Sequence, residues 1–515
     1  MQALTLGSNG NPLHTNSRTT GHGPLAPPHA RVLAESTSFV RRHSLRLLAI
    51  SCVLLIPCFW HRRIVATDLG SHLYNAWLAQ LIRHGQAPGL WIARQWTNVL
   101  FDFLLSGLSS VFGFPVAEKV AVSLAVLIFF WGVFAMVSAA TRRAPWFLLP
   151  CIALVTYGYT FHMAFFNYYL SLGLSFFSLA IFWRGRGWER LLGYALAPLI
   201  VLAHPLGLAW LVGASVYVVI AERLPARFQW LLLVPAAAAL AGAHYYLWRH
   251  FIVEAAPDPL YMFNGADQLL LFGERYHLIE RAALAFGAVA CATDFVRRRR
   301  EPGMGRDYAI PLQLYLLVAL AVPLLPRGIT FSQHNSAIAL LTERMTSVSA
   351  ALVCCILGAM RPSKWHLAGS AAIAAVFFSF VYQDTAVFNR MEQQAEQLVR
   401  TLPPNQRVLA TILAPSDSRI AIQHMIDRAC IGHCFSYGNY EPASSDFRVR
   451  ALPGNPYVMS RSEDTDAMED GSYVVKPEDL PAYQVYQCDE TGTMLCISPL
   501  AAGQENDTLG VHPDE

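Results

Sequence analysis

Charged residues are scarce in this sequence of 515 residues. Asp, Glu, Lys and Arg make up 14% of it, whereas a soluble domain carries about a quarter. This shortage argues against a single soluble core, a nucleic-acid binder, a coiled coil and a disordered chain. The sequence also lacks a Walker-type phosphate loop, the His-Glu-x-x-His motif of zinc proteases and the Rossmann glycine fingerprint.

Apolar residues dominate instead, at 54% of the chain. They form long runs separated by short arginine clusters, a pattern typical of an all-α polytopic membrane protein. We predict about eleven transmembrane helices and a small extracytoplasmic α/β domain at the C-terminus. The predicted spans are 45–61, 117–139, 146–161, 169–183, 190–203, 206–221, 229–248, 278–296, 308–326, 345–360 and 366–382.

Composition divides the chain further. Residues 1–44 are rich in Gly, Pro, His, Ser and Thr and are predicted to be a disordered cytoplasmic arm. The transmembrane domain covers 45–384, with a long first outer loop at 62–116. An extracytoplasmic α/β domain follows at 385–500, with a predicted helix from Thr385 to Leu402 and strand-like runs at 408–413, 473–475 and 483–486. Residues 501–515 are predicted to be a flexible tail.

Charge is distributed unevenly between the two ends. Residues 391–515 hold 19 acidic and 8 basic side chains, against 16 acidic and 30 basic in the rest. Because loops rich in Arg and Lys stay in the cytoplasm, the N-terminus is predicted to be cytoplasmic and the acidic domain periplasmic or extracellular, in a bacterial inner membrane. This topology requires the segment Thr97 to Phe114 to lie in the membrane interface and His204-Pro205 to form an outer turn.

The first outer loop carries the candidate catalytic residue, Asp68. A carboxylate at the membrane surface is partly desolvated, which raises its basicity while a substrate hydroxyl can still reach it. The alternative is that Asp68 only caps the helix that follows. That helix, over residues 72–83, places His72, Asn75 and Arg83 on one side and apolar residues on the other, as an interfacial amphipathic helix does.

Other outer segments supply candidate substrate-binding residues. Tyrosines, a histidine and an asparagine at 157–169 suit sugar binding, although an aromatic belt without a ligand looks the same. Outer arginines suit a lipid phosphate, although they also occur as snorkelling side chains at helix ends. The candidates are His72, Arg94, Tyr159, His162, Asn167, His204, Arg275, Arg327, His334 and Arg344.

Cysteines fall into two groups. Six lie in predicted spans and are interpreted as packing residues. The other four, in the outer domain, favour disulfides, and local pairing of Cys430 with Cys434 and Cys488 with Cys496 is one of three possibilities. Zinc binding with His424 and His433 is the alternative, but the spacing fits no standard site.

The order of these features resembles the GT-C superfamily of integral-membrane glycosyltransferases, which includes protein O-mannosyltransferases and the lipid A aminoarabinose transferase. Members carry an acidic catalytic residue directly after the first span, followed by interfacial helices. Asp68, the helix at 71–84, its Gly85-Gln86-Ala87-Pro88 exit and the segment 97–114 match that order.

The resemblance implies transfer of a sugar, with inversion, from a polyprenyl-phosphate donor to a glycan, lipid or protein acceptor on the extracytoplasmic face, in assembly of envelope polysaccharide, glycolipid or glycoprotein. Asp68 would take the acceptor proton. Relatives that use a divalent metal carry a carboxylate in the second outer loop, where this chain has His162 and Asn167. This difference argues against a metal, although a divalent cation stays an alternative. Membrane lipids are the other expected partners, and nucleic acid is not one. The alternatives are a flippase or transporter for a lipid-linked glycan and a non-enzymatic scaffold with an outer binding domain.

Overall fold

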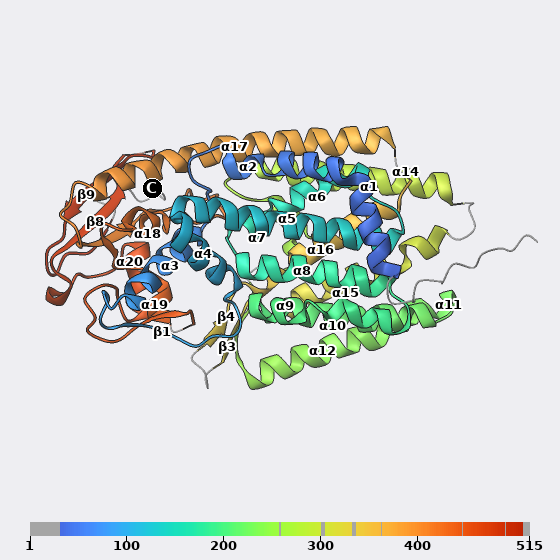
Figure 1. The fold of residues 1–515 in the computed structure, drawn as a ribbon, viewed down its shortest axis with the longest axis horizontal. Coiled ribbons are helices and arrows are strands. Elements are labelled where there is room, and N and C mark those ends of the chain that lie inside the picture. Colours follow the sequence, from blue (N-terminus) through green and yellow to red (C-terminus); the bar gives the residue numbers. More distant parts are fainter. Residues whose placement is uncertain are drawn as a thin grey trace, which may run out of the picture.

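The computed structural model describes residues 31–256, 259–299, 304–331, 336–361, 363–444, 446–489 and 491–507. The protein is mostly helical, with 66% helix and a small region of strands near the C-terminus. Its long helices lie side by side in a bundle, and most of the strands gather at one end of that bundle (Figure 1).

Six helices in the described part of the chain are long and apolar enough to cross a membrane, and each coincides with a predicted span. They indicate a membrane protein. They are α5 (Phe114–Thr141), α8 (Phe166–Arg184), α10 (Pro205–Arg223), the run Arg227–His250 that includes α12 (Leu233–His250), α16 (Leu341–Ala359) and α17 (Lys364–Val399).

The other five predicted spans fall on helices that are shorter or carry more charge. In α14, for example, Glu280, Arg281 and Asp294 interrupt the apolar run, so a count of eleven stays a prediction. The helices concerned are α1 (Arg31–Leu54) with α2 (Ile56–Phe59), η2 (Trp146–Leu148) with α6 (Leu149–Thr156) and α7 (Tyr159–His162), η3 (Gly187–Tyr194) with α9 (Ala197–Ala203), α14 (Arg275–Arg298), and α15 (Met304–Leu324).

The backbone breaks where the sequence predicts an outer turn. Helix α9 ends at Ala203 and α10 begins at Pro205, while His204 between them is extended, with φ −165° and ψ 133°. Proline disfavours a helical conformation for the residue before it and cannot donate a backbone hydrogen bond, so one helix cannot run through this point.

Helix α1 begins earlier than expected. Residues 31–44 were predicted to belong to the disordered arm, but they form the first part of α1, while residues 1–30 lie outside the described residues. The segment contains no Gly or Pro, and it has a partner to pack on. Phe39 stacks on Trp146 with ring centroids 5.9 Å apart, and the guanidinium of Arg46 lies 3.8 Å from the same ring.

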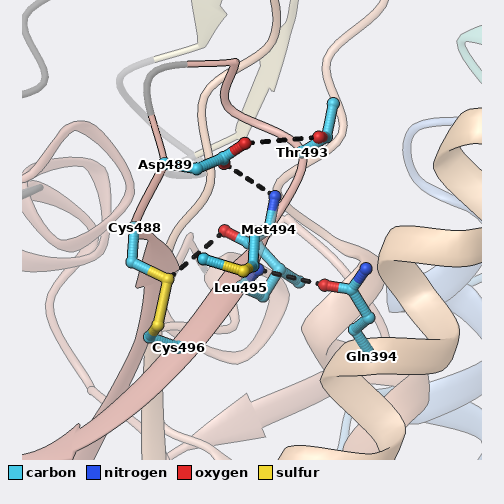
Figure 2. Close-up of a disulfide and its surroundings, with 7 residues drawn as sticks. All are labelled: Gln394, Cys488, Asp489, Thr493, Met494, Leu495 and Cys496. Atoms are coloured by element: carbon cyan, nitrogen blue, oxygen red, sulfur yellow. Dashed lines mark hydrogen bonds between the residues drawn. A yellow bond between two sulfur atoms is a disulfide. The ribbon is translucent and has the colours of Figure 1, made fainter.

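Helix α17 is longer than any helix predicted from the sequence. The predicted span 366–382 and the separate helix Thr385 to Leu402 form one helix of 36 residues, since no Gly or Pro separates them. The helix runs along the bundle and continues beside the C-terminal strands (Figure 1). There Gln394 accepts a hydrogen bond of 3.0 Å from the backbone of Leu495 (Figure 2).

The C-terminal domain contains a four-stranded sheet in the order β6-β5-β8-β9. Its strands are β5 (Arg407–Thr411), β6 (Phe435–Ser436), β8 (Ala482–Gln487) and β9 (Leu495–Pro499). Strand β5 pairs in parallel with β6 and β8, and β9 is antiparallel to β8. The predicted strand-like runs at 408–413 and 483–486 correspond to β5 and β8, whereas the run at 473–475 makes only a single bridge, from Val474 to Glu505.

The end of the chain is also more ordered than expected. Residues 501–515 were predicted to be a flexible tail, but residues 503–506 form backbone hydrogen bonds with the domain, and residues 508–515 lie outside the described residues. Asn506 is fully buried, and its amide donates to the hydroxyl of Thr411 at 3.1 Å and to the carbonyl of Met468 at 2.7 Å.

The loop at 62–116, which is predicted to be the first outer loop, is built into the C-terminal domain. Strand β1 (Leu90–Ile92) pairs antiparallel with β7 (Val449–Ala451), and α3 (Leu69–Arg83) packs on α18 (Met425–Cys430). Most of α3 is buried. The domain therefore covers the polar side of α3, which was expected to face water. The Ser, His and Asn side chains on that side form hydrogen bonds there. The segment expected in the membrane interface forms α4 (Leu100–Phe112), which contacts α3 and α5.

The remaining elements are short. A three-stranded sheet, in the order β2-β3-β4, connects two loops of the bundle. The strands are β2 (Ile252–Glu254), β3 (Gly328–Phe331) and β4 (Ser336–Ile338), and the helices are α11 (Ala226–Gln229), η4 (Trp230–Leu232), α13 (Pro259–Met262), η5 (Ala266–Leu269), α19 (Tyr440–Ser444), α20 (Ser462–Asp470) and η6 (Pro477–Asp479).

Candidate active site

Asp68 lies where the first outer loop, the bundle and the C-terminal domain meet. Its neighbour Thr67 donates a backbone hydrogen bond of 2.8 Å to the carbonyl of His162 and a hydroxyl hydrogen bond of 3.0 Å to the carbonyl of Ala421. Asp68 directly precedes α3, but its side chain makes no capping hydrogen bond. The carboxylate is 20% exposed, so it is largely desolvated and still reachable, and capping does not explain its presence.

Cationic groups surround this carboxylate. The Nε2 atom of His424 lies 3.8 Å from Oδ1 of Asp68. Burial raises the pKa of Asp68, and the positive charges of His424, His72 and Arg344 counteract that rise. A carboxylate held in this way is more basic than one on an open surface, while its neighbours still favour the ionised form.

His424 is itself held in its protonated form. Burial alone would lower its pKa, but the charges of Glu469, Asp427 and Asp68 and a hydrogen bond with Asp427 raise the pKa to about 10. Its Nδ1 atom lies 3.4 Å from Asp427 and 3.8 Å from Glu469. The imidazolium therefore links Asp68 to two carboxylates of the C-terminal domain.

His72 forms a second link, toward α4 and α8. Its Nδ1 atom is 3.2 Å from Oδ1 of Asp102 and 3.6 Å from Glu441. Burial opposes protonation, but the hydrogen bond with Asp102 and the charges of Asp102, Glu441 and Asp68 raise the pKa of His72 to about 9. Burial likewise opposes ionisation of Asp102, yet the hydrogen bond and charge of His72 lower the pKa of that carboxyl. Asn167 completes the link by donating to Oδ2 of Asp102 at 3.1 Å.

A network of neutral side chains connects α3 to the C-terminal domain beside these charges. Ser71 donates to Glu441 at 3.2 Å, and Asn75 donates to Asn439 at 3.1 Å. Asn439 in turn donates to Asp427 at 2.9 Å. Burial raises the pKa of Glu441 to about 8 although the charge of His72 acts in the opposite direction. These contacts fix the orientation of α3, and with it the position of Asp68.

Arg344 supplies the cation on the bundle side. It lies in the first turn of α16, where its Nη1 atom donates to Nε2 of His204 at 3.1 Å. Its guanidinium stacks over Phe165, 4.4 Å from the ring centroid. Its Nε atom is buried and has no hydrogen-bond partner among the described residues. Arg344 thus keeps an unused donor close to Asp68.

The structure brings together half of the predicted substrate-binding residues. Four of them belong to the network around Asp68: His72, Asn167, His204 and Arg344. The fifth, His162, contacts the loop that holds Asp68, since its carbonyl accepts a hydrogen bond from the backbone nitrogen of Thr67. The ring of His162 is buried, 3.2 Å from the carbonyl of Val65, and burial lowers its pKa to about 4.

The other predicted residues lie elsewhere. Tyr159 is buried beneath the guanidinium of Arg419, 4.4 Å away. Arg94 is exposed on the first loop. Arg275 is paired with Asp384, Arg327 is paired with Glu254 and Glu343 at 3.1 Å each, and His334 lies outside the described residues.

Sequence reasoning did not place at this site the residues that the C-terminal domain contributes, and it considered His424 only as an alternative zinc ligand. His424, Asp427 and Glu441 come from α18, α19 and the turn before α18, far along the chain from Asp68. No local motif marks them. The spacing of His424 and Asp427, one helical turn apart, is the single signal available, and it is a weak one.

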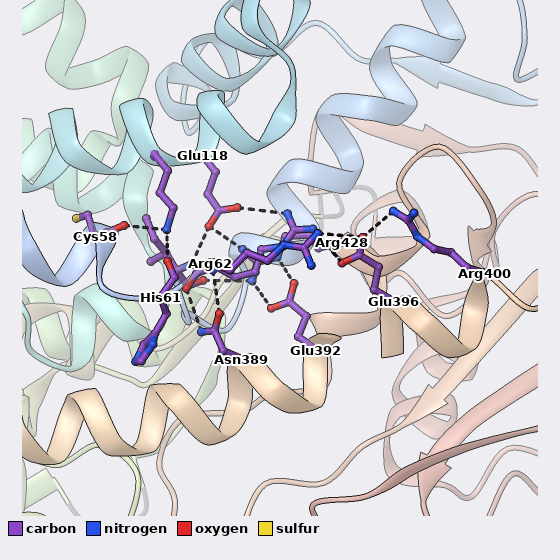
Figure 3. Close-up of polar contacts among 12 residues, drawn as sticks. Cys58, His61, Arg62, Glu118, Asn389, Glu392, Glu396, Arg400 and Arg428 are labelled. Carbon is purple, nitrogen blue, oxygen red and sulfur yellow. Dashed lines mark hydrogen bonds and ion pairs between the residues drawn. The ribbon is translucent and has the colours of Figure 1, made fainter. Parts of the chain in front are cut away.

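A second charged cluster, formed by Arg428, Glu118 and Glu392, holds the domain on the bundle. Arg428 lies 3.0 Å from Glu118 and 2.5 Å from Glu392, and all three side chains are buried. Figure 3 shows the two carboxylates approaching Arg428 from α5 and α17. Glu118 also accepts a hydrogen bond of 2.7 Å from the backbone of Ile64, four residues before Asp68.

The cysteines and carboxylates suggest no metal centre. Cys430 is disulfide-bonded to Cys434, and Cys488 to Cys496 (Figure 2). In the described ranges, no group of three or more His, Cys, Asp or Glu side chains is arranged to hold a metal ion.

Comparison with known proteins identifies no relative. No family model matches the chain, and no curated protein or solved structure matches it either. The arrangement itself is that of a buried, reachable carboxylate between two protonated histidines and a partly unpaired arginine. It can accept a proton from a neutral group and hold an anion close by.

Proposed function

We propose that the chain is an inverting glycosyltransferase of GT-C type, which moves a sugar from a polyprenyl-phosphate donor to an acceptor on the extracytoplasmic face of a membrane. The observation that carries the proposal is the environment of Asp68. Its carboxylate follows the first helices of the bundle, caps nothing, is 20% exposed and is ringed by cations. An aspartate with only a structural role would be expected to cap the helix or to form a close ion pair.

Asp68 is the proposed general base. The acceptor hydroxyl attacks the anomeric carbon of the donor sugar and gives its proton to Asp68, while the bond between that carbon and the phosphate oxygen breaks. A single displacement inverts the anomeric carbon. Burial raises the pKa of Asp68 and with it the basicity of the carboxylate, while the positive charges of His424 and His72 counteract that rise.

Arg344 is the proposed partner of the leaving lipid phosphate. The phosphate gains negative charge as the bond to the sugar breaks, and a cation in a low-dielectric site stabilises that charge strongly. The buried Nε atom of Arg344 has no partner among the described residues, so it offers a donor that no protein group uses. His204 and Phe165 hold the guanidinium in place.

We further propose eleven spans with a cytoplasmic N-terminus, in a bacterial inner membrane. The disulfides support an outward-facing C-terminal domain, because both lie in it and the free cysteines described lie in the helices of the bundle. A reporter that is active only outside the cytoplasm should give a signal when fused after Arg400 and none when fused after Arg361. The reverse pattern would invert the topology and remove Asp68 from the outer face.

Sugar transfer in membrane vesicles tests the proposed base. Vesicles that contain the wild-type protein, the Asp68→Asn variant or the Asp417→Asn variant are supplied with radiolabelled hexoses on polyprenyl phosphate. Asp417 is an exposed aspartate outside the cluster, so its variant controls for the substitution itself. We expect transfer by the wild type and the Asp417 variant only. Full activity of Asp68→Asn at equal abundance would rule out Asp68 as the base.

A further inference from the structure

A cavity of about 320 Å³ opens between the loop after α2 and the middle of α17. Asp68 does not line it. The lining residues that matter here are His61, Arg62, Arg63, Tyr382, Arg390 and Glu396. A volume of this size is at the lower end of the range that ligand-binding pockets occupy, about 300–1,000 Å³.

Positive charge is in excess in this cavity. Arg62 and Arg63 both pair with Glu396, at 3.2 and 3.4 Å, and Glu396 also pairs with Arg400 at 2.6 Å. Glu396 therefore pairs with three arginines, and one of them, Arg63, also lies 4.0 Å from Glu118. Arg390 is exposed and makes no hydrogen bond or ion pair with any residue that the structure describes. The cavity can accept an anion without displacing a protein carboxylate.

The cavity lies at the boundary between the apolar and polar parts of two helices. The apolar run of α17 ends at Tyr382, and the lipid-type residues of α2 end at Phe59, which is exposed. Between them, Trp60 and Tyr382 pack edge to face at 5.4 Å, and His61 stacks on Tyr382 at 4.7 Å. Aromatic side chains concentrate at this depth in membrane proteins, level with the lipid headgroups.

The cavity is also rigid where an anion would bind. Asn389 accepts a hydrogen bond of 2.9 Å from the backbone nitrogen of Arg63 and donates one of 3.0 Å to its carbonyl. Figure 3 shows Asn389 and Glu396 on one face of α17, opposite His61 and Arg62. The arginines are thus presented by a backbone that is already fixed, which lowers the entropic cost of binding.

We infer that this cavity binds the phosphate headgroup of an anionic membrane lipid. Guanidinium groups match phosphate oxygens with paired donors, and the exposed apolar residues of α1 and α2 provide a surface for acyl chains beside the cavity. The inference goes beyond sugar transfer. It uses no property of Asp68, so it stands or falls separately from the proposed function.

Lipid retention by the purified full-length protein tests the inference. The protein in mild detergent is mixed with a phosphatidylglycerol or with a phosphatidylcholine of the same chains, and bound lipid is counted by native mass spectrometry. The variants are Arg390→Gln, which removes no protein contact, and Arg62→Gln with Arg390→Gln. Arg249→Gln is the matched control, since Arg249 is an exposed arginine at the end of an apolar helix and outside the cavity.

We expect phosphatidylglycerol to bind the wild type in preference to phosphatidylcholine. Each arginine removed from the cavity should weaken that binding about fivefold, and Arg249→Gln should leave it unchanged. Equal retention by all variants would overturn the inference. Retention of inorganic phosphate but not of phosphatidylglycerol, measured in a separate arm, would also overturn it in favour of a site for free anions.

Discussion

The imidazole of His424 lies 3.8 Å from the carboxylate of Asp68 and links the C-terminal domain to the first outer loop. His424 also contacts Asp427 and Glu469. These two carboxylates favour the protonated form of His424, and its positive charge acts on Asp68. The domain is therefore part of the candidate active site as well as a cover for it.

Replacing His424 should change the pH dependence of sugar transfer. In His424→Gln the positive charge that favours ionised Asp68 is lost, so the pKa of Asp68 rises further. The acidic limb of the pH profile should move to higher pH by about one unit or more. An unchanged profile in a variant with normal abundance would show that His424 does not act on the group that titrates.

Stability should decrease as the pH is raised. The pKa values of His72 and His424 are raised from 6.5 to about 9 and about 10 in the folded protein. The stability that their protonation provides is fully present below pH 6.5 and is lost as the pH rises through 9 and 10. Glu441, raised to about 8, acts in the same direction.

The thermal midpoint in detergent measures this effect between pH 6.5 and 10. His72→Gln should flatten the decline, because one of the two titrating histidines is gone. His84→Gln should leave it unchanged, since His84 is exposed at the end of α3. A decline equally steep in both variants would contradict the assignment to His72.

Gly70 is predicted to tolerate no side chain. A Cβ atom there would lie 2.1 Å from the carbonyl oxygen of His424, so Gly70→Ala must push α18 away from α3. We expect a loss of about 1–3 kcal/mol in stability and a loss of transfer activity. Gly107→Ala on α4 is the control, because nothing lies within 4 Å of its added methyl group. Equal stability of the two variants would contradict the close contact.

The buried cluster around Arg428 should matter more than a surface ion pair. Arg428→Met leaves Glu118 and Glu392 buried without their shared cation, at a cost of about 3–5 kcal/mol. Arg400→Met removes an arginine that is 67% exposed and should cost no more than about 1 kcal/mol. Thermal unfolding of both variants makes the comparison, and similar losses would mean that the cluster does not anchor the domain.

The elements that the sequence predicts well are those decided locally. Apolar runs locate the helices of the bundle, Pro205 locates a helix break, and β5 and β8 follow from short runs of strand-forming residues. The continuity of α17 was missed because a change in polarity at Tyr382 looks like an end, although no residue there stops a helix.

The candidate site was predictable only on its bundle side. In the sequence, three residues can be recognised as candidates: Asp68, His72 and Arg344. They are charged or polar residues next to predicted apolar spans, where such residues are candidates for a function. Asp102 is not among the predicted site residues, because its contacts with His72 and Asn167 depend on how α4 packs. The contributions of His424 and Glu441 depend on docking between distant parts of the chain, which periodicity and composition do not encode.

Release of polyprenyl phosphate by the purified protein decides whether Asp68 is the base. The wild type, Asp68→Asn and Asp417→Asn are compared with the same panel of polyprenyl-phosphate hexoses and with binding of the donor measured in parallel. A general base contributes about a hundredfold to ten-thousandfold to the rate. We therefore expect Asp68→Asn to bind donor normally and to release phosphate at least a hundredfold more slowly. Undiminished release by this variant would contradict the account.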